Sequence, residues 1–368
     1  MKNAKPIYIV SYLTYRDKKS FVGGIRPYKL YKFLSAQGYN AHLITPTSDT
    51  GEEMVIPEWK GLSLINSLTR ALPPDRLLFW SLRVARSLRQ QIGNRPGVVI
   101  TSLPPHSLGL VGLWLKRWLP NIEWIVDFRD LWTKNTLYAP PLTKRFVDPI
   151  IERRYFDVAD LVVLNTSWDL SHNRSLFPSI KDKSIFIRNG FDNLSESIFE
   201  ERSTSFIYTG GTTAGQATVA VSTFLRDIHT EHGISFQCDF YGEYDDHMDQ
   251  SAYINYKGKV EPDVVSKVLS NYKFGFIYLP VNSEGGGRVA QKFYDYLAAG
   301  VIPICFRASQ EMNDMIQSLE VGISIPNEVN TAKILEAIVN SSFTVKPEKL
   351  EEYRREYQFT KLLPFLNK

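Results

Sequence analysis

A glycine-rich turn in the second half of the chain has the composition of a phosphate-binding loop. It follows the apolar run that ends at Leu279 and contains Glu284, Gly285, Gly286 and Gly287 in succession. Glycine lets the backbone approach a ligand closely, and the N-terminus of a following helix attracts anions. We therefore expect this turn to hold a phosphate group.

Three charged residues follow the glycines at helical spacing. Arg288, Lys292 and Asp295 lie in a segment, ending at Ala299, that we predict to be a helix. Residues four and three positions apart share one helix face, so the three side chains are expected to form one stripe. Arg288 and Lys292 would neutralise a diphosphate, and Asp295 would accept hydrogen bonds from ribose hydroxyls. The alternative interpretation is a ladder of charges that faces water.

Charged residues also follow two predicted strands of the first half. His106 comes shortly after one apolar run, and Asp127, Arg129 and Asp130 come at the end of the next. His106, Asp127 and Asp130 are the candidate catalytic residues, because clustered ionisable groups at strand ends often mark a site. We expect the two carboxylates to contact substrate hydroxyls and Arg129 to hold their loop. A structural histidine and a buried ion pair are the alternatives.

The elements that position these residues follow a βαβ pattern. Short β-rich apolar runs alternate with amphipathic stretches along the whole chain, which predicts an α/β fold with parallel sheets. A chain of 368 residues is too long for a single core, and a polar stretch at 193–202 separates two runs of alternation. The predicted units are a Rossmann-like domain at 1–190, a second Rossmann-like domain at 196–345, and a C-terminal helical segment at 346–368 that packs back on the first domain.

Charge is distributed unevenly between the two halves. Residues 1–195 carry 27 Lys and Arg against 16 Asp and Glu, although the net charge of the whole chain is only +4. Within this half, Arg83, Arg86 and Arg89 are three residues apart among apolar side chains, which predicts a basic amphipathic helix. Such a helix binds anionic lipid, or it packs on the core with its basic face in water.

Several classes of protein are disfavoured by the sequence. The two cysteines lie in apolar runs, no signal peptide precedes the first strand, and no uncharged apolar window is long enough to cross a bilayer. The six histidines are dispersed, so no metal site is expected. Neither half has G-x-G-x-x-G after its first strand, which argues against a dinucleotide oxidoreductase. We therefore expect a cytoplasmic protein without a cofactor, peripheral at the inner face of the plasma membrane if the basic helix binds lipid.

The segment from Lys292 to Pro303, KFYDYLAAGVIP, resembles the signature of glycosyltransferase family 4. In that family an acid at the position of Asp295, usually Glu, contacts the donor ribose. The family often has another Glu where Gly287 stands, which leaves Glu284 as an unaligned substitute.

Other segments resemble the same family in the same order along the chain. They are Gly23 and Gly24 after the first strand, the D-x-R-D-x-W segment 127–132, the N-G-x-D segment that begins at Asn189, and Gly210 with Gly211 after the strand that opens the second domain. The resemblance implies that these glycines and Asn189 lie near the donor.

The resemblance implies a GT-B fold, with two Rossmann-like domains facing across a cleft. It also implies a retaining glycosyltransferase, for hexosyl or N-acetylhexosaminyl transfer, that lacks a conventional protein nucleophile. The donor would be a nucleotide diphosphate sugar, with UDP as the expected nucleotide, and the acceptor a glycan or a polyprenyl-diphosphate-linked sugar in bacterial surface polysaccharide synthesis. Contact with anionic membrane fits this acceptor, and nucleic acid is not an expected partner.

One departure from the family concerns the diphosphate. Many members have an Arg and, five residues on, a Lys that clamp it, but this chain has Gly211 and Gln216 there. Two alternatives therefore stay open: a nucleotide-sugar 2-epimerase of the same architecture and a non-catalytic nucleotide-sugar-binding protein.

Overall fold

The computed structural model describes most of the chain, in segments separated by short gaps. The described residues are 5–15, 21–58, 73–135, 138–195, 202–244, 246–261, 264–280, 283, 286–325, 330–340 and 346–367.

The chain forms two compact units. Unit 1 comprises residues 1–188 together with 359–368, and unit 2 comprises residues 189–358. The C-terminal segment expected at 346–368 is thus divided, because only its residues from Phe359 onward belong to unit 1.

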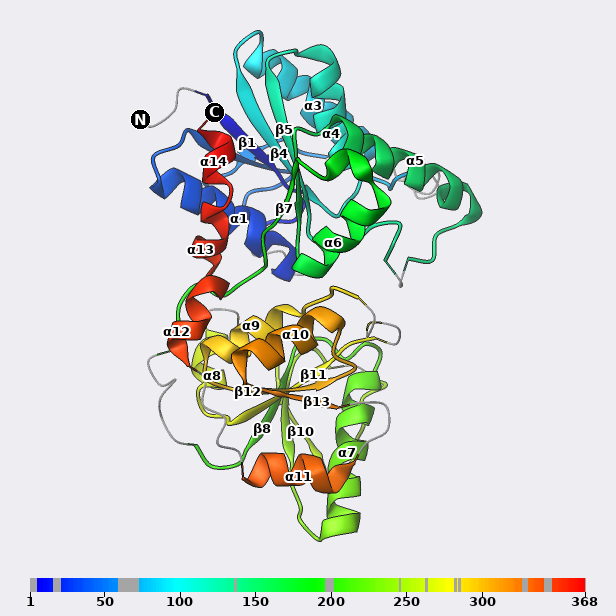
Figure 1. The fold of residues 1–368 in the computed structure, drawn as a ribbon, viewed down its shortest axis with the longest axis vertical. Helices are drawn as coiled ribbons and strands as arrows, with labels where there is room; N and C mark the ends of the chain where they lie inside the picture. The colour runs from blue at the N-terminus through cyan, green and yellow to red at the C-terminus, as the bar shows by residue number, and fades with distance from the viewer. Residues whose placement is uncertain are drawn as a thin grey trace. The chain divides into compact units, whose positions relative to one another are not determined.

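Unit 1 is built on a seven-stranded parallel sheet in the order β3-β2-β1-β4-β5-β6-β7 (Figure 1). Its strands are β1 (Ile7–Val10), β2 (Ala41–Thr45), β3 (Met54–Val55), β4 (Gly97–Leu103), β5 (Ile122–Phe128), β6 (Leu161–Leu164) and β7 (Ser184–Phe186). Its helices are α1 (Phe21–Ala36), α3 (Leu78–Ile92), α4 (Leu108–Trp118), α5 (Leu142–Val158), α6 (Ser167–Leu176), η1 (Pro178–Ile180) and α14 (Leu363–Leu366), and α13 (Arg355–Thr360) begins in unit 2 and ends here.

Apolar layers cover both faces of this sheet. On one face α3, α4 and α5 pack against β4 and β5, and on the other α1 packs with the end of the chain, where Phe33 meets Phe359. Helix α4 lies so close to the sheet that a β-carbon at Gly112 would overlap the indole of Trp124. Small residues at these contacts therefore fix the loops at the carboxyl ends of β4 and β5.

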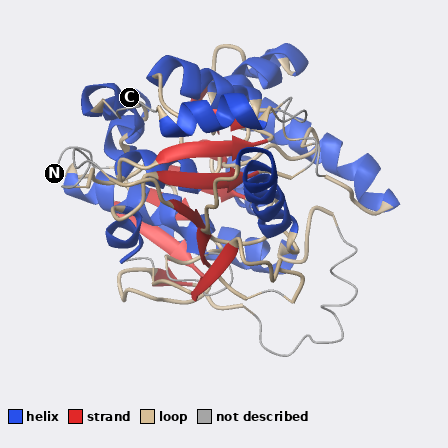
Figure 2. Ribbon diagram, turned by 90° about the horizontal axis from the view of Figure 1, so that it is seen from below, coloured by secondary structure: helices blue, strands red, loops and turns tan. Residues whose placement is uncertain are grey.

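Unit 2 is built on a six-stranded parallel sheet in the order β10-β9-β8-β11-β12-β13. Its strands are β8 (Phe206–Thr209), β9 (Cys238–Tyr241), β10 (Ile254–Gly258), β11 (Phe274–Tyr278), β12 (Ile302–Phe306) and β13 (Ile323–Ile325). Its helices are α7 (Gln216–His232), α8 (Val265–Leu269), α9 (Gln291–Ala298), α10 (Gln310–Leu319), α11 (Thr331–Val339), α12 (Pro347–Leu350) and η4 (Glu351–Tyr353). Helices flank the strands on both sides (Figure 2), and the predicted pair of parallel α/β sheets is confirmed.

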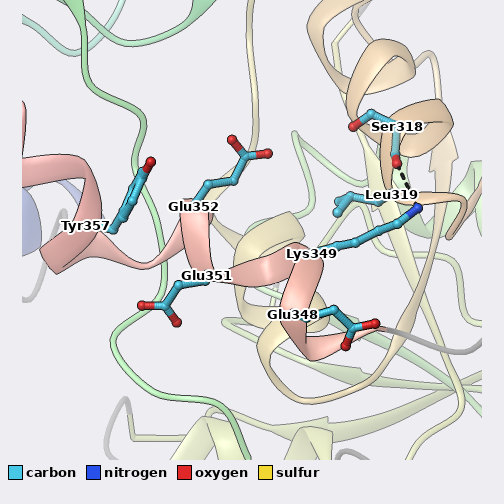
Figure 3. A pocket seen from close by; sticks show the side chains of 7 residues that line it. All are labelled: Ser318, Leu319, Glu348, Lys349, Glu351, Glu352 and Tyr357. Atoms are coloured by element: carbon cyan, nitrogen blue, oxygen red, sulfur yellow. Dashed lines mark hydrogen bonds between the residues drawn. The ribbon is translucent and has the colours of Figure 1, made fainter.

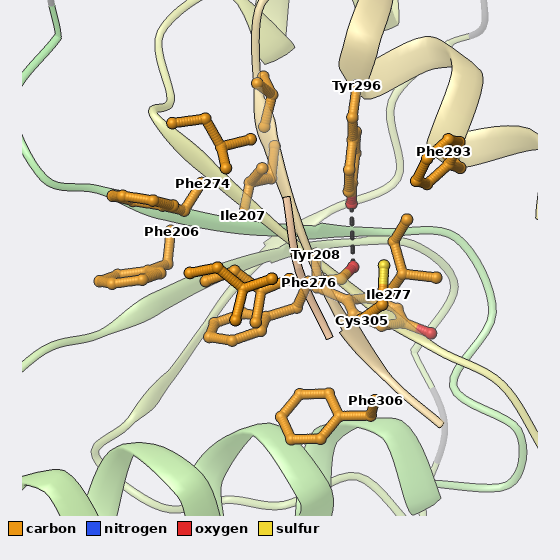
Figure 4. Close-up of a cluster of buried hydrophobic side chains, with 14 of the residues drawn as sticks. Phe206, Ile207, Tyr208, Phe274, Phe276, Ile277, Phe293, Tyr296, Cys305 and Phe306 are labelled. Carbon is orange, nitrogen blue, oxygen red and sulfur yellow. Dashed lines mark hydrogen bonds between the residues drawn. The ribbon is translucent and has the colours of Figure 1, made fainter. Parts of the chain in front are cut away.

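Aromatic side chains fill the core of unit 2. Phe206, Phe274 and Phe276 stack along the central strands (Figure 4). Tyr296 of α9 reaches into this core, and its hydroxyl donates to the carbonyl of Phe276 at 3.2 Å. A β-carbon at Gly275 would overlap the Tyr296 ring, so the small residue in β11 determines how closely α9 packs.

Helix α3 is oriented toward the core of unit 1. Trp80, Val84 and Leu88 are buried on one side, and the predicted basic stripe is exposed on the other. Of the stripe, Arg89 lies over the ring of Trp118, with its guanidinium 5.3 Å from the ring centre. The contacts thus fit the core-packing interpretation of this helix. Within the described part of the chain, no helix is long and apolar enough to cross a membrane.

Candidate functional site

The loops after β8, β11 and β12 meet at one edge of the sheet in unit 2. These three strands are neighbours and run in parallel, so their carboxyl ends lie side by side. Ligands of open parallel sheets bind outside this edge. The side chains and backbone that reach it come from β8, from α9 and from the residue that follows β12.

The ammonium group of Lys292 is the central charge of this edge. It extends from α9 to lie 3.9 Å from the ring centre of Tyr208, and a β-carbon at Gly210 would be only 3.5 Å from its Nζ. Among the described residues it has neither a hydrogen bond nor an ion pair. Removal from water lowers the pKa of this ammonium to about 7, although the Asp295 carboxylate acts in the opposite direction. Binding of an anionic ligand would therefore stabilise the charged form of Lys292.

The backbone beside Lys292 is open. Gly210 has φ of +96°, and a β-carbon at Gly211 would meet no atom within 4 Å. The carbonyl of Gly211 accepts a hydrogen bond from the Tyr208 hydroxyl at 2.8 Å. The absence of the family's Arg at position 211 thus leaves free space next to the Lys292 ammonium.

A second cation, Arg307, lies at the same edge and was not among the predicted site residues. It follows β12 with φ of +57°, and its guanidinium donates to the Tyr278 hydroxyl at 2.8 Å. That hydroxyl donates to Gln216 Oε1 at 3.1 Å, so Tyr278 connects Arg307 to the position where the resemblance places a Lys. The sequence signal was a cation directly after a buried strand of the second sheet.

Asp295 lies one turn further along α9 and is held by a neighbouring amide. Gln291 Nε2 donates to its Oδ1 at 2.9 Å and also to the carbonyl of Gly190 at 3.0 Å. Burial raises the pKa of the Asp295 carboxyl to about 6, against the hydrogen bond from Gln291 and the charge of Arg355. Above this pH the carboxylate can accept hydrogen bonds from hydroxyl groups.

The loop that begins at Asn189 is fixed next to α9. Gly190 cannot carry a side chain, because a β-carbon would overlap the carbonyl of Tyr353. The Arg355 guanidinium donates to the Gly190 carbonyl and pairs with Asp192. Unit 2 therefore brings together the predicted residues Asn189, Gly210, Gly211, Lys292 and Asp295.

The predicted stripe on the helix is wrong for Arg288. Helix α9 begins at Gln291, with Ala290 in an extended conformation at its N-cap, so Arg288 precedes the helix and is exposed. Its carbonyl accepts a hydrogen bond from Ser309 Oγ at 2.7 Å, which ties this stretch to the loop before α10. Of the predicted glycine turn, Gly286 and Gly287 lie in the same non-helical stretch, whereas 284 and 285 lie outside the described residues.

In unit 1, Asp127 is buried in an ion pair with Arg26. The guanidinium donates Nε to Oδ2 at 2.9 Å and Nη2 to Oδ1 at 2.7 Å, and Ser102 Oγ lies 3.4 Å from Oδ2. Arg26 also donates to the carbonyl of Ile187 at 2.8 Å. Both oxygens of Asp127 are thus engaged within the protein, which favours the buried-ion-pair interpretation over contact with a substrate.

Arg129 joins two loops at the carboxyl edge of this sheet. Its guanidinium donates to the carbonyls of Gly23, Leu103 and Pro104, and its backbone N–H donates to Leu103 as well. Gly23 and Gly24 lie in the first turn of α1, and a β-carbon at Gly24 would overlap the carbonyl of Thr14. Gly24 thus allows close backbone packing, and Arg129 holds the turn through the carbonyl of Gly23.

His106 and Asp130 lie on the same loops but have different surroundings. The His106 ring stacks on Trp132, with ring centres 4.2 Å apart, and its Nδ1 is buried without a hydrogen-bond partner among the described residues. Burial, with smaller effects from Arg129 and Lys144, lowers the pKa of His106 to about 3. The imidazole is therefore neutral at physiological pH. Asp130 is exposed.

A hollow of about 460 Å³ lies elsewhere in unit 2, between α10 and the segment α12–η4 (Figure 3). Three of its seven lining residues are acidic and one is basic; they are Ser318, Leu319, Glu348, Lys349, Glu351, Glu352 and Tyr357. Lys349 donates to the carbonyl of Ser318 at 3.3 Å and pairs with Glu320. Carboxylates of this density repel a diphosphate, so this hollow is not a candidate for that ligand. No group of three potential metal ligands occurs in the part of the chain that the structure describes.

The structural role of Asp127 can be tested by stability. We expect Asp127→Asn to lower the free energy of unfolding by about 3–5 kcal/mol, because it leaves the Arg26 guanidinium buried without its counter-charge. Asp130→Asn is the matched control, and since Asp130 is exposed its effect should stay within about 0.5 kcal/mol. Urea unfolding of both variants measures the difference. Equal stability of the two would contradict the structural role.

Comparison with known proteins gives one matching family model and several similar structures. The family model described as "Glycosyl transferase 4-like domain" matches residues 23–190, and no curated protein sequence matches the chain. The structure is similar to a glycosyltransferase from Rickettsia africae (15% identity, 99% of this chain and 98% of that chain, TM-score 0.63). It is also similar to WaaG, described as a glycosyltransferase involved in lipopolysaccharide biosynthesis (10% identity, 96% of this chain and 95% of that chain, TM-score 0.60). A third similar structure is MnaA of S. aureus with UDP (10% identity, 98% of this chain and 96% of that chain, TM-score 0.57). The chain thus has the GT-B fold, and its residues 23–190 match the model of a glycosyl transferase 4-like domain.

Proposed function

We propose that the protein is a glycosyltransferase that takes its sugar from a nucleotide diphosphate, with UDP as the nucleotide, and retains the anomeric configuration. The observation that supports a diphosphate is the Lys292 ammonium, which lies at the carboxyl edge of the unit 2 sheet without an anionic hydrogen-bond partner among the described residues. The similar structure of MnaA contains UDP, which supports the choice of nucleotide.

In this proposal Lys292 and Arg307 replace the Arg and Lys that clamp the diphosphate in many family members. Lys292 lies beside Gly210, next to position 211, and Arg307 connects through Tyr278 to Gln216. When the bond to the sugar breaks, negative charge develops on the leaving diphosphate, and fixed cations stabilise it more than they stabilise the bound donor. The two cations thus act on the leaving group, and the charge of the phosphates would raise the pKa of Lys292 again.

The nucleoside is held at the other end of α9. We assign Asp295 to the ribose hydroxyls and the loop of Asn189 to the donor, since Gln291 connects the two through its hydrogen bonds to Asp295 and Gly190. Arg288 is exposed before the N-terminus of α9, and we leave its role in donor binding open.

Acceptor binding is assigned to the carboxyl edge of the unit 1 sheet. His106 is neutral there and would contact the acceptor through Nε2, because its Nδ1 is buried, and Asp130 offers an exposed carboxylate. Arg129 and Asp127 serve as positioning residues for these loops. We assign no covalent nucleophile.

The acceptor that we propose is a glycan or a polyprenyl-diphosphate-linked sugar, in the synthesis of a bacterial surface polysaccharide at the cytoplasmic face of the membrane. The similarity to WaaG, described as acting in lipopolysaccharide biosynthesis, supports this class of product. The transferred group would be a hexosyl or an N-acetylhexosaminyl residue.

A non-catalytic nucleotide-sugar-binding protein is the second candidate, because the usual clamp is missing at Gly211 and Gln216. The presence of Lys292 and Arg307 at the same edge favours catalysis over this alternative. A 2-epimerase would invert C2 of the sugar without requiring an acceptor, and the sugar would remain attached to the nucleotide.

Turnover tests the proposal. The protein is incubated with a panel of nucleotide sugars, with and without lipid-linked acceptors, and nucleotide release is measured together with the identity of the sugar. Lys292→Met and Arg307→Gln are each expected to lower kcat/KM by about 10²-fold, because each removes a cation from the leaving group. Lys333→Met, an exposed lysine on α11, is the matched control and should leave the rate unchanged. Release that is equally fast in all variants would contradict the assignment of the diphosphate, and a changed sugar without transfer would indicate an epimerase.

The two shifted pKa values predict a pH window for UDP binding. Lys292 loses its charge as the pH rises above about 7, and Asp295 becomes neutral as the pH falls below about 6. Affinity should therefore be highest between these values and decline on both sides. Because bound phosphate raises the pKa of Lys292, binding at about pH 8 should take up nearly one proton. Isothermal titration in buffers of different ionisation enthalpy measures this uptake, and Lys292→Met should abolish it. Uptake that persists in that variant would show that another group titrates.

A further inference from the structure

Helix α5 has its polar and apolar sides exchanged relative to an ordinary surface helix. Asp148 and Glu152 face inward and are buried, whereas Leu142, Phe146 and Ile150 face outward with 72%, 72% and 69% of their surface exposed. These three residues are four positions apart, so they form a continuous apolar stripe about 12 Å long. None of the described residues covers the stripe.

The buried acids of α5 have partners on the acceptor side of unit 1. Asp148 accepts a hydrogen bond from the Tyr138 hydroxyl, and Glu152 accepts from the backbone and the hydroxyl of Thr133. Tyr155, on the same inner side, donates to the carbonyl of His106 at 3.0 Å. The inner side of α5 thus holds the loops that carry the candidate acceptor residues, which leaves the outer side free for another contact.

The outer side is basic as well as apolar. Arg145, Arg153 and Arg154 are exposed on α5, and Asp157 is the exposed acid of this helix. Arg153 and Asp157 are 3.9 Å apart and both largely exposed, so their pairing is weak. An apolar stripe beside exposed arginines matches a surface that presents hydrocarbon and negative charge together.

Helix α3 differs in this respect. Its apolar residues face the core, and Phe79, the large apolar residue exposed on it, has 43% of its surface accessible. The basic stripe of α3 therefore lacks an apolar stripe beside it, and the expected lipid contact is better assigned to α5.

We propose that the exposed side of α5 docks unit 1 on an anionic lipid bilayer. Leu142, Phe146 and Ile150 enter the boundary between headgroups and acyl chains, and the arginines contact lipid phosphates, as in interfacial amphipathic helices. Docking on this side places the lipid surface behind the loops of His106 and Thr133. The inference extends the proposed lipid-linked acceptor by assigning the surface that meets the membrane.

The apolar stripe is tested by flotation with vesicles of phosphatidylcholine alone and of phosphatidylcholine mixed with phosphatidylglycerol. The parent protein should bind only the mixed vesicles, and salt should weaken the binding. A variant with Leu142→Ser, Phe146→Ser and Ile150→Ser should lose at least about tenfold in partitioning. Binding of this variant at the level of the parent, or failure of the parent to bind mixed vesicles at low salt, would overturn the proposal.

Matched charge variants separate this surface from a general attraction of a basic protein. The α5 variant carries Arg145→Gln, Arg153→Gln and Arg154→Gln. The control removes the same charge from α3 and carries Arg83→Gln, Arg86→Gln and Arg89→Gln. The α5 variant should lose at least about tenfold in partitioning, and the α3 variant should lose much less. Equal loss in both would overturn the assignment to α5.

Two further measurements keep the outcome clear. Sedimentation shows whether the stripe instead binds a second copy: a parent dimer that the serine variant converts to a monomer would overturn the lipid proposal. Circular dichroism and UDP binding, which involves unit 2, verify that each variant is folded. Nucleotide release from soluble donors does not require a bilayer, so loss of vesicle binding with normal release refutes this inference and leaves the proposed function standing.

Discussion

The proposed donor site depends on one contact, in which the Lys292 ammonium lies over the ring of Tyr208. Water solvates an ammonium far better than an aromatic ring does, yet this one lies over Tyr208 without a hydrogen-bonded anion among the described residues. The packing of α9 imposes this position, because Tyr296 on the same helix is anchored in the core through Phe276. The cost of desolvation is the reason why the pKa of Lys292 falls to about 7, and an anionic ligand would reverse it.

The surrounding residues are arranged around this charge. Gly210 and Gly211 keep the space in front of it open, and Arg307 approaches the same edge from β12 through its hydrogen bond to Tyr278. In unit 1, by contrast, Asp127 and Arg129 already have partners within the protein. Arg26 pairs with Asp127, and Arg129 donates to three carbonyls, so these residues fix the loops that carry His106 and Asp130.

The sequence predicted the two sheets because parallel strands, buried on both faces, appear as continuous apolar runs. It also placed Lys292 and Asp295 correctly on one helix. It misplaced Arg288, because the start of α9 depends on a tertiary hydrogen bond from Ser309 that spacing does not reveal. It missed Arg307 for a similar reason, since the relation of this residue to Gln216 arises only when β11 and β12 pair. The inverted helix α5 shows the same limit: its acids are buried because Tyr138 and Thr133 meet them in the fold.

A crystal structure of the protein with bound UDP tests the central claim most directly. The account predicts that the diphosphate lies against Gly210 and Gly211, with Lys292 Nζ and the Arg307 guanidinium within hydrogen-bonding distance of its oxygens and the ribose hydroxyls at Asp295. A diphosphate bound elsewhere, with Lys292 still over the ring of Tyr208 and distant from any phosphate, would contradict it.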